Sequence, residues 1–326
     1  MSEPSAEDKL IARYFAAIAV HPGALGLTDD AAFLKPPAGC DLVLTSDAII
    51  GGVHFFADDA AQTVAAKALR VNVSDLAAKG AEPLGFLVSL ALPNGLGERW
   101  LADFAEGLRG DAALYGCPLL GGDTDRTPGP ITISVAMFGA VPEGTMVRRA
   151  GARQGDRVFV TGTIGDAALG LALRKGKAFA LNDTQREHLL ARYLLPQPRL
   201  ALAAAVRTHA SAAMDVSDGL AGDVAKLCRV SKVGAAIEIV RVPLSDAAQA
   251  AVAADPAMLE TALTGGDDYE ILCTVPAAKA DSFRAAAAAA KVQVTEIGAI
   301  EAGEGVRFLG ADGRPLVFAH AAFSHF

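Results

Sequence analysis

Acidic residues stand where short apolar segments of this chain end, and this arrangement constrains the fold more than any other feature of the sequence. In open α/β sheets, ligands bind beyond the ends of the strands. Neighbouring glycines and small hydroxylic residues let backbone and carboxylates approach a ligand closely. We therefore expect a sheet-based fold with a polar ligand site. The acidic clusters are Asp29-Asp30, Asp47, Asp123, Asp215 with Asp218, and Asp267-Asp268.

The spacing of apolar residues predicts helices and strands mixed through both halves of the chain, which indicates an α/β or α+β class. Pro142-Glu143-Gly144 interrupts the pattern, so we expect two domains, residues 1–143 and 144–326. The first half is predicted to contain helices over 8–20, 60–79 and 98–115, and strands over 42–44, 84–92, 118–120 and 131–141. The second is predicted to contain strands over 157–160, 235–240 and 269–275 and one strand ending near Asp215. Its predicted helices follow the turn 162–166, cover 184–193 and 199–209, follow Asp218 and include residues 285–290.

Composition excludes several classes of protein. The chain has 29 basic and 37 acidic residues, a net charge of −8, which argues against a nucleic-acid binder because phosphate backbones attract basic surfaces. No apolar run reaches the roughly 18 residues that a membrane span needs. The start of the chain is polar and acidic, so we expect no secretory signal. Four scattered cysteines are typical of buried thiols in a reducing compartment. We expect a cytoplasmic protein.

The acidic clusters favour a site for divalent cations. Any one aspartate is explained by a helix cap or a turn. Two carboxylates about 4 Å apart, however, repel by roughly 4 kcal/mol at an effective dielectric of 20, so several in one cleft need cations. Oxygen ligands suit Mg²⁺ or Ca²⁺, and the calcium-loop pattern is absent, which favours Mg²⁺. Asp75 lies in a predicted helix, on a stripe that is either solvated or directed at the metal site.

Several Mg²⁺ ions in one site most often serve phosphoryl transfer from a nucleotide. The P-loop, the protein-kinase motifs and the dinucleotide fingerprint are all absent from this sequence. The nearest approach to a P-loop, at Gly165–Gly170, is followed by Leu171 in place of lysine. Any ATP would therefore be held by metal-bridged carboxylates and glycine turns.

These motifs resemble the thiamine-monophosphate kinase family, within the aminoimidazole-ribonucleotide-synthetase-like superfamily. The resemblance covers nearly the whole chain, and its blocks follow one another in order. They include Asp29-Asp-Ala-Ala32, Thr45-Ser-Asp47, Gly52-Val-His-Phe55, Asn72-Val-Ser-Asp-Leu-Ala77, Gly121-Gly-Asp-Thr124, Asp215-Val-Ser-Asp-Gly-Leu220, Gly266-Asp-Asp-Tyr-Glu270 and Phe323-Ser-His-Phe326.

The resemblance implies a reaction of ATP with thiamine monophosphate that gives ADP and thiamine diphosphate, with several Mg²⁺ ions. It also implies a homodimer in which the N-terminal α/β domain joins its strands to those of a partner, beside a C-terminal α/β domain. The metal ligands that it implies are Asp30, Thr45, Ser46, Asp47, Asp75, Asp123, Asp215 and Asp218. The implied ATP contacts are Gly122, Asp123, Arg149 and Ser217, and the implied thiamine-phosphate contacts are His54, Glu270 and Phe323.

The acceptor phosphate has a second pKa of about 6 and is mostly a dianion at neutral pH, so we expect direct transfer without a catalytic base. The family usually has Gly-Ile-Gly before its aspartate pair, whereas this chain has Gly26-Leu27-Thr28, which leaves the choice between Asp29 and Asp30 open. The sequence also leaves open whether K⁺ is required.

Each implied substrate contact has an ordinary structural alternative. His54 could be a core or surface histidine, Arg149 a solvated arginine, Glu270 a solvent-facing strand residue and Phe323 C-terminal packing. At the level of the whole chain, the alternatives are another ATP-dependent synthetase of the same superfamily and a non-catalytic nucleotide-binding relative. The selenide and carbamoyl enzymes use a terminal cysteine, which this sequence lacks.

Overall fold

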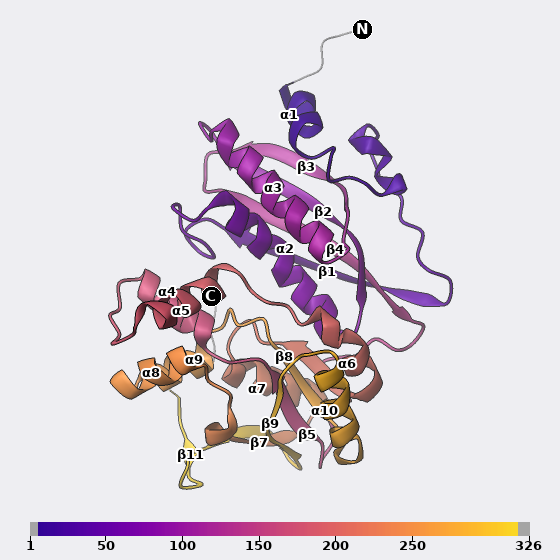
Figure 1. Cartoon of the computed structure of the whole chain (residues 1–326). Coiled ribbons are helices and arrows are strands. Elements are labelled where there is room, and N and C mark those ends of the chain that lie inside the picture. Colours follow the sequence, from indigo (N-terminus) through magenta and orange to yellow (C-terminus); the bar gives the residue numbers. More distant parts are fainter. Residues whose placement is uncertain (1–5, 319–326) are drawn as a thin grey trace. The chain divides into compact units, whose positions relative to one another are not determined.

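A computed structural model describes residues 6–318 of the chain, which form two compact units (Figure 1). Unit 1 contains the chain up to Leu76 and Glu82–Gly144. Unit 2 contains Ala77–Ala81 and the chain from Thr145 onward. The short segment Ala77–Ala81, which the sequence analysis assigns to the first domain, thus groups with the second unit.

Unit 1 is built on a mixed sheet that has four strands among the described residues, in the order β1-β4-β2-β3. Strand β4 pairs antiparallel with β1 and β2, and β2 pairs parallel with β3, so β1 and β3 form the two edges. The elements are α1 (Ala6–Tyr14), η1 (Pro22–Leu27), β1 (Cys40–Ile50), α2 (Ala61–Ala78), β2 (Glu82–Pro93), α3 (Glu98–Leu114), β3 (Leu119–Thr127) and β4 (Thr132–Pro142).

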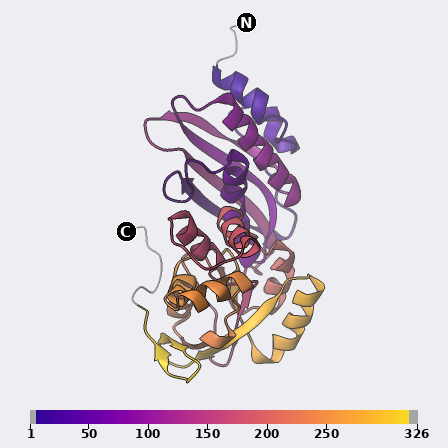
Figure 2. The ribbon, with the colours of Figure 1, turned by 60° about the vertical axis from the view of Figure 1, so that its left-hand side comes forward.

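Helices α2 and α3 lie along one face of this sheet (Figure 1 and Figure 2). Alternation along the strands produces the two faces, because successive side chains point to opposite sides. In β2, Phe86, Val88 and Leu90 are buried toward the helices, whereas Ser89 is exposed on the other face. Leu42 and Leu44 of β1 are also exposed. One face of the sheet therefore forms the core of unit 1, and the other carries polar and exposed apolar side chains.

Unit 2 is built on a mixed sheet with seven strands in the described part of the chain, ordered β11-β10-β7-β9-β5-β8-β6. Helix α7 packs on one face, where Val158 and Leu272 contribute to its core. Helices α6 and α10 pack on the opposite face, with Phe159 and Phe283 in contact. Alternate residues of β5 and β8 thus serve two cores, which explains why residues 158–161 of β5 and the whole of β8 are buried.

The elements of unit 2 are β5 (Arg157–Thr161), α4 (Asp166–Arg174), α5 (Asp183–Leu194), η2 (Leu200–Leu202), α6 (Ala203–His209), β6 (Ala212–Asp215), α7 (Leu220–Ser231), β7 (Gly234–Glu238), η3 (Ile239–Arg241), α8 (Asp246–Ala254), α9 (Met258–Thr264), β8 (Ile271–Val275), η4 (Ala277–Lys279), α10 (Ala280–Ala289), β9 (Val294–Glu301), β10 (Gly305–Leu309) and β11 (Pro315–Leu316).

The mixed α/β class and the long helices α2 and α3 are confirmed, but the position of the acidic residues relative to the strands is partly wrong. Asp215 ends β6, as predicted. Asp47 and Asp123, in contrast, lie inside β1 and β3, which continue well past the predicted apolar cores. Both are edge strands, where polar side chains can point to solvent without interrupting the ladder. Within residues 6–318, no helix has both the length and the apolar character to cross a membrane.

Candidate active site

In unit 1, the first group of candidate residues lies where β1 and α2 are in contact. The hydroxyl group of Thr45 donates a hydrogen bond to the Asp75 carboxylate. The backbone N–H of Asp47 donates to Oδ1 of Asn72 at 3.0 Å, and Nδ2 of this buried asparagine donates to the Ala68 carbonyl. The stripe on α2 is therefore not fully solvated, and it holds the middle of β1 in register. Thr45 and Asp75 are thus in contact, and the backbone of Asp47 is joined to the same helix through Asn72.

His54 follows β1 in a tight turn. Its ring Nδ1 accepts a hydrogen bond from the Ile50 N–H at 3.0 Å. Because Nδ1 is the acceptor, the proton of the neutral ring lies on Nε2. The buried ammonium group of Lys67 donates to the His54 carbonyl at 2.9 Å and fixes the turn. His54 is therefore oriented by its own backbone, with an N–H donor on the opposite side of the ring.

A second group of acidic residues lines a pocket of about 630 Å³ beside β3. Asp29, Asp30 and Asp123 contribute carboxylates, and Ser89 and Gly122 lie among the lining residues. Apolar side chains complete the wall, among them Ile11, Leu34, Leu87 and Phe138. Thr28 has a negative φ of −112°, whereas Leu27 takes a left-handed φ of 57°. The left-handed turn is thus completed before Thr28, and both aspartates line the pocket.

Gly122 has a structural reason to be glycine. A Cβ atom at this position would lie 1.8 Å from the backbone oxygen of Val88 on the neighbouring strand. Such a contact forces the backbone to move, because neither partner is a flexible side chain. Close pairing of β2 and β3 therefore requires glycine here, independently of any ligand.

The two acidic groups of unit 1 lie far apart on the same sheet. Asp47 lies on β1 and Asp123 on β3, the opposite edges, so three strand spacings separate them by about 14 Å. They also face opposite sides. Asp47 pairs through Val135 with the buried Val88, whereas Asp123 pairs with the exposed Ser89. Within the described residues, no three histidine, cysteine or acidic side chains gather as a metal-binding group.

In unit 2, the loop after β6 carries Asp215, Ser217 and Asp218. Asp215 is buried, with 6% of its surface exposed, and the other two are half-buried. The carboxylate of Asp223, in the first turn of α7, accepts the backbone N–H groups of both Ser217 and Asp218 at 3.0 Å. Burial raises the pKa of Asp223 above its ordinary value, against the opposing effect of Lys226. This inward-facing carboxylate fixes the backbone of the loop.

The segment Gly266–Glu270 lies against that loop. The N–H of Asp267 donates to the Ser217 carbonyl and that of Tyr269 to the Val216 carbonyl, both at 2.8 Å. Asp267 and Tyr269 hold left-handed φ values of 65° and 51°, which cost energy for residues other than glycine. Their side chains are half-buried, whereas Asp268 is fully buried. The strained backbone therefore directs alternate side chains outward and inward.

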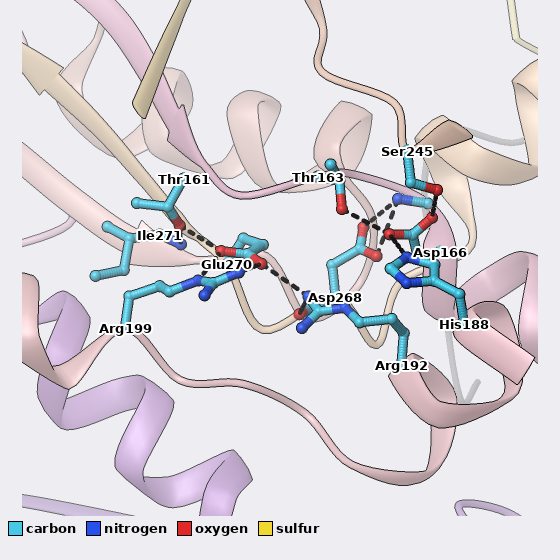
Figure 3. Close-up of polar contacts among 11 residues, drawn as sticks. Thr161, Thr163, Asp166, His188, Arg192, Arg199, Ser245, Asp268, Glu270 and Ile271 are labelled. Atoms are coloured by element: carbon cyan, nitrogen blue, oxygen red, sulfur yellow. Dashed lines mark hydrogen bonds and ion pairs between the residues drawn. The ribbon is translucent and has the colours of Figure 1, made fainter. Parts of the chain in front are cut away.

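Glu270 is one of the inward residues, so the alternative of a solvent-facing strand residue is wrong. The side chain of Glu270 is fully buried, and the residue immediately precedes β8 (Figure 3). Oε1 accepts Nη2 of Arg192 at 2.7 Å and Nη2 of Arg199 at 2.5 Å. Oε2 accepts Nε of Arg199 at 2.7 Å and the hydroxyl of Thr161 at 2.6 Å. Four donors occupy this carboxylate, and the two arginines leave the cluster with an excess positive charge.

The N-terminus of α4, the position of the partial P-loop match, is occupied by carboxylates (Figure 3). Both oxygens of Asp268 accept the Gly165 N–H at 2.9 Å. Burial raises the pKa of Asp268 well above its ordinary value. Asp166, also fully buried, accepts from Thr163, His188 and Ser245. No phosphate loop forms at this helix, because the protein's own acids take the anion position.

The remaining predicted residues are placed as follows. Arg149 is exposed, and its carbonyl accepts the Ser231 hydroxyl at 3.4 Å. Ser46 is exposed on β1, on the face opposite Thr45. Phe323 lies outside the described residues. Sequence analysis missed Arg192, Arg199 and Asp223, because a charged residue within an amphipathic helix reads as solvated; only the structure reveals that these side chains are turned inward.

Comparison with known proteins identifies relatives of both units. Two family models match: the AIR synthase related protein N-terminal domain over residues 28–141, and the corresponding C-terminal domain over residues 153–310. The thiamine-monophosphate kinase of Caulobacter vibrioides is 46% identical over 288 residues, covering 87% of this chain and 81% of that protein.

Comparison with solved structures identifies the same family. The crystal structure of thiamine-monophosphate kinase from Stenotrophomonas maltophilia K279a matches with a TM-score of 0.84 and 36% identity, over 97% of this chain and 98% of that one. The structure of AaThiL complexed with AMPPCP and TMP matches with a TM-score of 0.79 and 34% identity, over 91% of both chains. The chain therefore belongs to the thiamine-monophosphate kinase family, within the AIR synthase related superfamily.

Proposed function

We propose that this chain transfers a phosphoryl group from ATP to thiamine monophosphate, giving ADP and thiamine diphosphate. The observation that carries the proposal is the 46% identity to a thiamine-monophosphate kinase over 87% of the chain. The related AaThiL structure, which holds AMPPCP and TMP, supports a site for a nucleotide together with a second phosphorylated ligand.

The nucleotide contacts in this proposal are Gly122 and Asp123 in unit 1, and Arg149 and Ser217 in unit 2. The pocket beside β3 supports the first pair, because it combines carboxylates with an apolar wall. An apolar wall suits a flat base, and the adjoining carboxylates suit the metal ions that accompany a triphosphate. An exposed guanidinium such as that of Arg149 is suited to bidentate contact with phosphate.

The donors of this chain fit Mg²⁺. The proposed ligands offer only oxygen atoms, and Asp218 already attracts a cation, the ammonium group of Lys226. Mg²⁺ commonly takes one or two carboxylates and completes its shell with water and substrate phosphates, so three protein acids need not converge. When bound, the ions would neutralise phosphate charge and bridge the two reactants. The residues that would hold them are Asp30, Thr45, Ser46, Asp47, Asp75, Asp123, Asp215 and Asp218.

A homodimer is part of the proposal, with residues 1–143 as the domain that binds ATP and Mg²⁺ and pairs with a second copy, and 144–326 as the second α/β domain. Strand β1 supports pairing: it is an eleven-residue edge strand with Leu42 and Leu44 exposed, 38% and 65% respectively. A long edge with exposed apolar side chains tends to pair with another chain. The separation of Asp47 from Asp123 adds support, since a second copy could complete either group.

The proposed acceptor contacts are His54, Glu270 and Phe323. His54 presents Nε2–H as a donor for the acceptor phosphate, since Nδ1 is held by the Ile50 N–H. Glu270 would have to share a carboxylate that already accepts four hydrogen bonds. Its neighbour Asp267, half-buried on strained backbone, is better exposed to a cationic ring, and we add it to the proposed contacts.

No side chain is assigned as a catalytic base. The attacking phosphate oxygen is already ionised at neutral pH, so no proton has to be removed. The work of the protein is then to hold two polyanions in line, at a site where its own acids alone would repel them. His54 and Arg149 would orient the acceptor and donor phosphates, and the carboxylates would act through the cations they bind.

The test is to mix the purified protein with ATP, Mg²⁺ and thiamine monophosphate, and to separate the products by chromatography. Thiamine diphosphate and ADP in equal amounts support the proposal. ADP without thiamine diphosphate points to a different acceptor and hence to another synthetase of the superfamily. Nucleotide binding without any ADP identifies a non-catalytic relative. Replacing K⁺ by Na⁺ in the same assay tests for a K⁺ requirement.

A further inference from the structure

Lys226, on α7, connects two carboxylates that have different surroundings. Its ammonium group lies 2.8 Å from Oδ1 of Asp223, which is fully buried. It also forms an ion pair with Asp218, whose side chain is 36% exposed. Lys226 itself is 26% exposed at the side chain. One cation therefore joins an inward carboxylate of the helix to an outward carboxylate of the preceding loop.

The two carboxylates depend on Lys226 to different degrees. Asp223 has other partners, because its Oδ2 accepts the N–H groups of Ser217 and Asp218. For the Asp218 carboxylate, the contact with the lysine is its ion pair in the described structure. The loop backbone is thus held by Asp223, while Lys226 holds the Asp218 side chain. A change of cation at Asp218 can then occur without moving the loop.

We propose that Lys226 is a built-in cation that occupies Asp218 when no metal ion is bound and thereby weakens metal binding at that carboxylate. The inference rests on the metal role of Asp218 in the proposed function. A divalent ion that approaches Asp218 must displace the ammonium group or bind beside it, and like charges a few ångströms apart repel. Lys226 is accordingly a tuning residue for metal affinity, not a metal ligand or a catalytic residue.

The experiment measures binding of Mn²⁺ to the full-length protein without nucleotide, with free Mn²⁺ counted by its electron paramagnetic resonance signal. Lys226→Met removes the competing charge, and we expect the Kd of the tightest site to fall about two- to fivefold, within the range for a partly exposed ion pair. Lys226→Gln removes the charge but keeps an N–H donor for Asp223, and it should tighten binding as well, so an effect of misfolding is separated from an effect of charge.

Two controls isolate the contact. Lys175→Met removes an equal charge from an exposed position at the end of α4 and should leave the Kd unchanged. Asp218→Asn should weaken Mn²⁺ binding, and adding Lys226→Met to that variant should give no further tightening, since the interaction acts through one carboxylate.

The outcomes separate this inference from the proposed function. If Asp218→Asn weakens Mn²⁺ binding and neither Lys226 variant tightens it, Lys226 is not a competing cation and the inference is overturned. If Asp218→Asn leaves Mn²⁺ binding unchanged, Asp218 is not a metal ligand, and both the metal role and the inference fail at this residue. Absence of Mn²⁺ binding by Lys226→Met also overturns it. Formation of thiamine diphosphate, measured separately, tests the reaction itself.

Discussion

The acids of the two units are used in different ways. In unit 1, Asp30, Asp47 and Asp123 are exposed on or beside the sheet. In unit 2, Asp223, Asp268 and Glu270 are at most 1% exposed and accept hydrogen bonds from backbone N–H groups, arginines or a lysine. Sequence clusters of aspartate and glutamate in one chain thus contain two kinds of residue, those that keep their hydration and those that replace water with protein donors.

This difference in exposure distinguishes acids that are suited to bind ligands from acids that stabilise loops. An exposed carboxylate loses little when a hydrated cation approaches it, whereas a buried carboxylate with every lone pair occupied must give up protein donors first. Asp30, Asp47 and Asp123 of unit 1 are therefore suited to exchange of metal ions. The buried acids of unit 2 fix the loops 215–218 and 266–270, whereas the outward residues of those loops, such as Asp218 and Asp267, are only half-buried.

Asp47→Asn is the sharpest test of the proposed metal role of the exposed acids in unit 1. Loss of one negative oxygen in the proposed metal set should lower kcat more than about a thousandfold, or about 4 kcal/mol in activation free energy, because electrostatic stabilisation carries this chemistry. The exposed site should leave the midpoint of thermal unfolding within a degree or two. Asp41→Asn, an exposed aspartate on the same strand whose carboxylate accepts the Gly144 N–H, is the matched control and should keep its activity. Near-normal turnover by Asp47→Asn would remove Asp47 from the metal set.

Glu270→Gln tests the structural role of the buried acids of unit 2, and we expect it to lower the stability of the fold. The neutral amide leaves Arg192 and Arg199 without their shared counter-charge in a buried position, so the free energy of unfolding should fall by about 3 kcal/mol. Urea unfolding measures it. Glu296→Gln, whose carboxylate also binds arginines but at a more exposed site, should cost less than about 1 kcal/mol. A stable Glu270→Gln variant with a raised KM for thiamine monophosphate would instead make Glu270 a direct substrate contact.

Gly122→Ala tests whether a proposed nucleotide residue is also structural. The new Cβ meets the Val88 backbone oxygen, so unfolding free energy should fall by about 2 kcal/mol even without nucleotide. Gly110→Ala, in α3 with open space around it, should change stability in the opposite direction by up to about 1 kcal/mol. If both variants are equally stable, β2 and β3 can separate at this point, and the glycine is retained for the ligand.

Periodicity predicted the long elements because their environments are uniform. Helix α3 buries one apolar stripe, α2 is buried along almost its whole length, and buried residues of β2 and β4 alternate over much of each strand, so the apolar pattern located all four. It cut β1 and β3 short, since polar side chains follow the apolar segments that it had identified in these edge strands. Helices α8 and α9 and strands β9, β10 and β11 were not predicted, because short alanine- or glycine-containing segments carry little periodicity.

The candidate site was predictable as a set of residue types but not as a geometry. The motifs located Asp47, Asp75 and Asp123, yet nothing in the sequence indicates that two of them lie on opposite edges of one sheet. That separation depends on the strand order, which is set by long-range pairing. For the same reason, the inward direction of Glu270 depends on Arg192 and Arg199, more than 70 residues earlier in the chain.

A further test concerns the pH dependence of stability contributed by Asp268, one of the buried acids of unit 2. Burial raises the pKa of this carboxyl, the Gly165 N–H opposes the rise, and the negative charge of Asp166 adds to it. Because the folded state binds this proton more tightly than the unfolded state does, its contribution to stability is fully present below an unfolded pKa of about 4 and is lost as pH rises through the folded pKa.

In Asp268→Asn no proton titrates at this position. The unfolding free energy of the unmodified chain, minus that of the variant, should therefore fall as the pH rises above about 4, by at most about 1.4 kcal/mol per unit. Urea unfolding at several pH values measures the difference. Asp281→Asn removes a fully exposed carboxylate from α10 and should show no such fall. A difference that rises with pH would mean that the hydrogen bonds from Gly165 outweigh the effect of burial at Asp268.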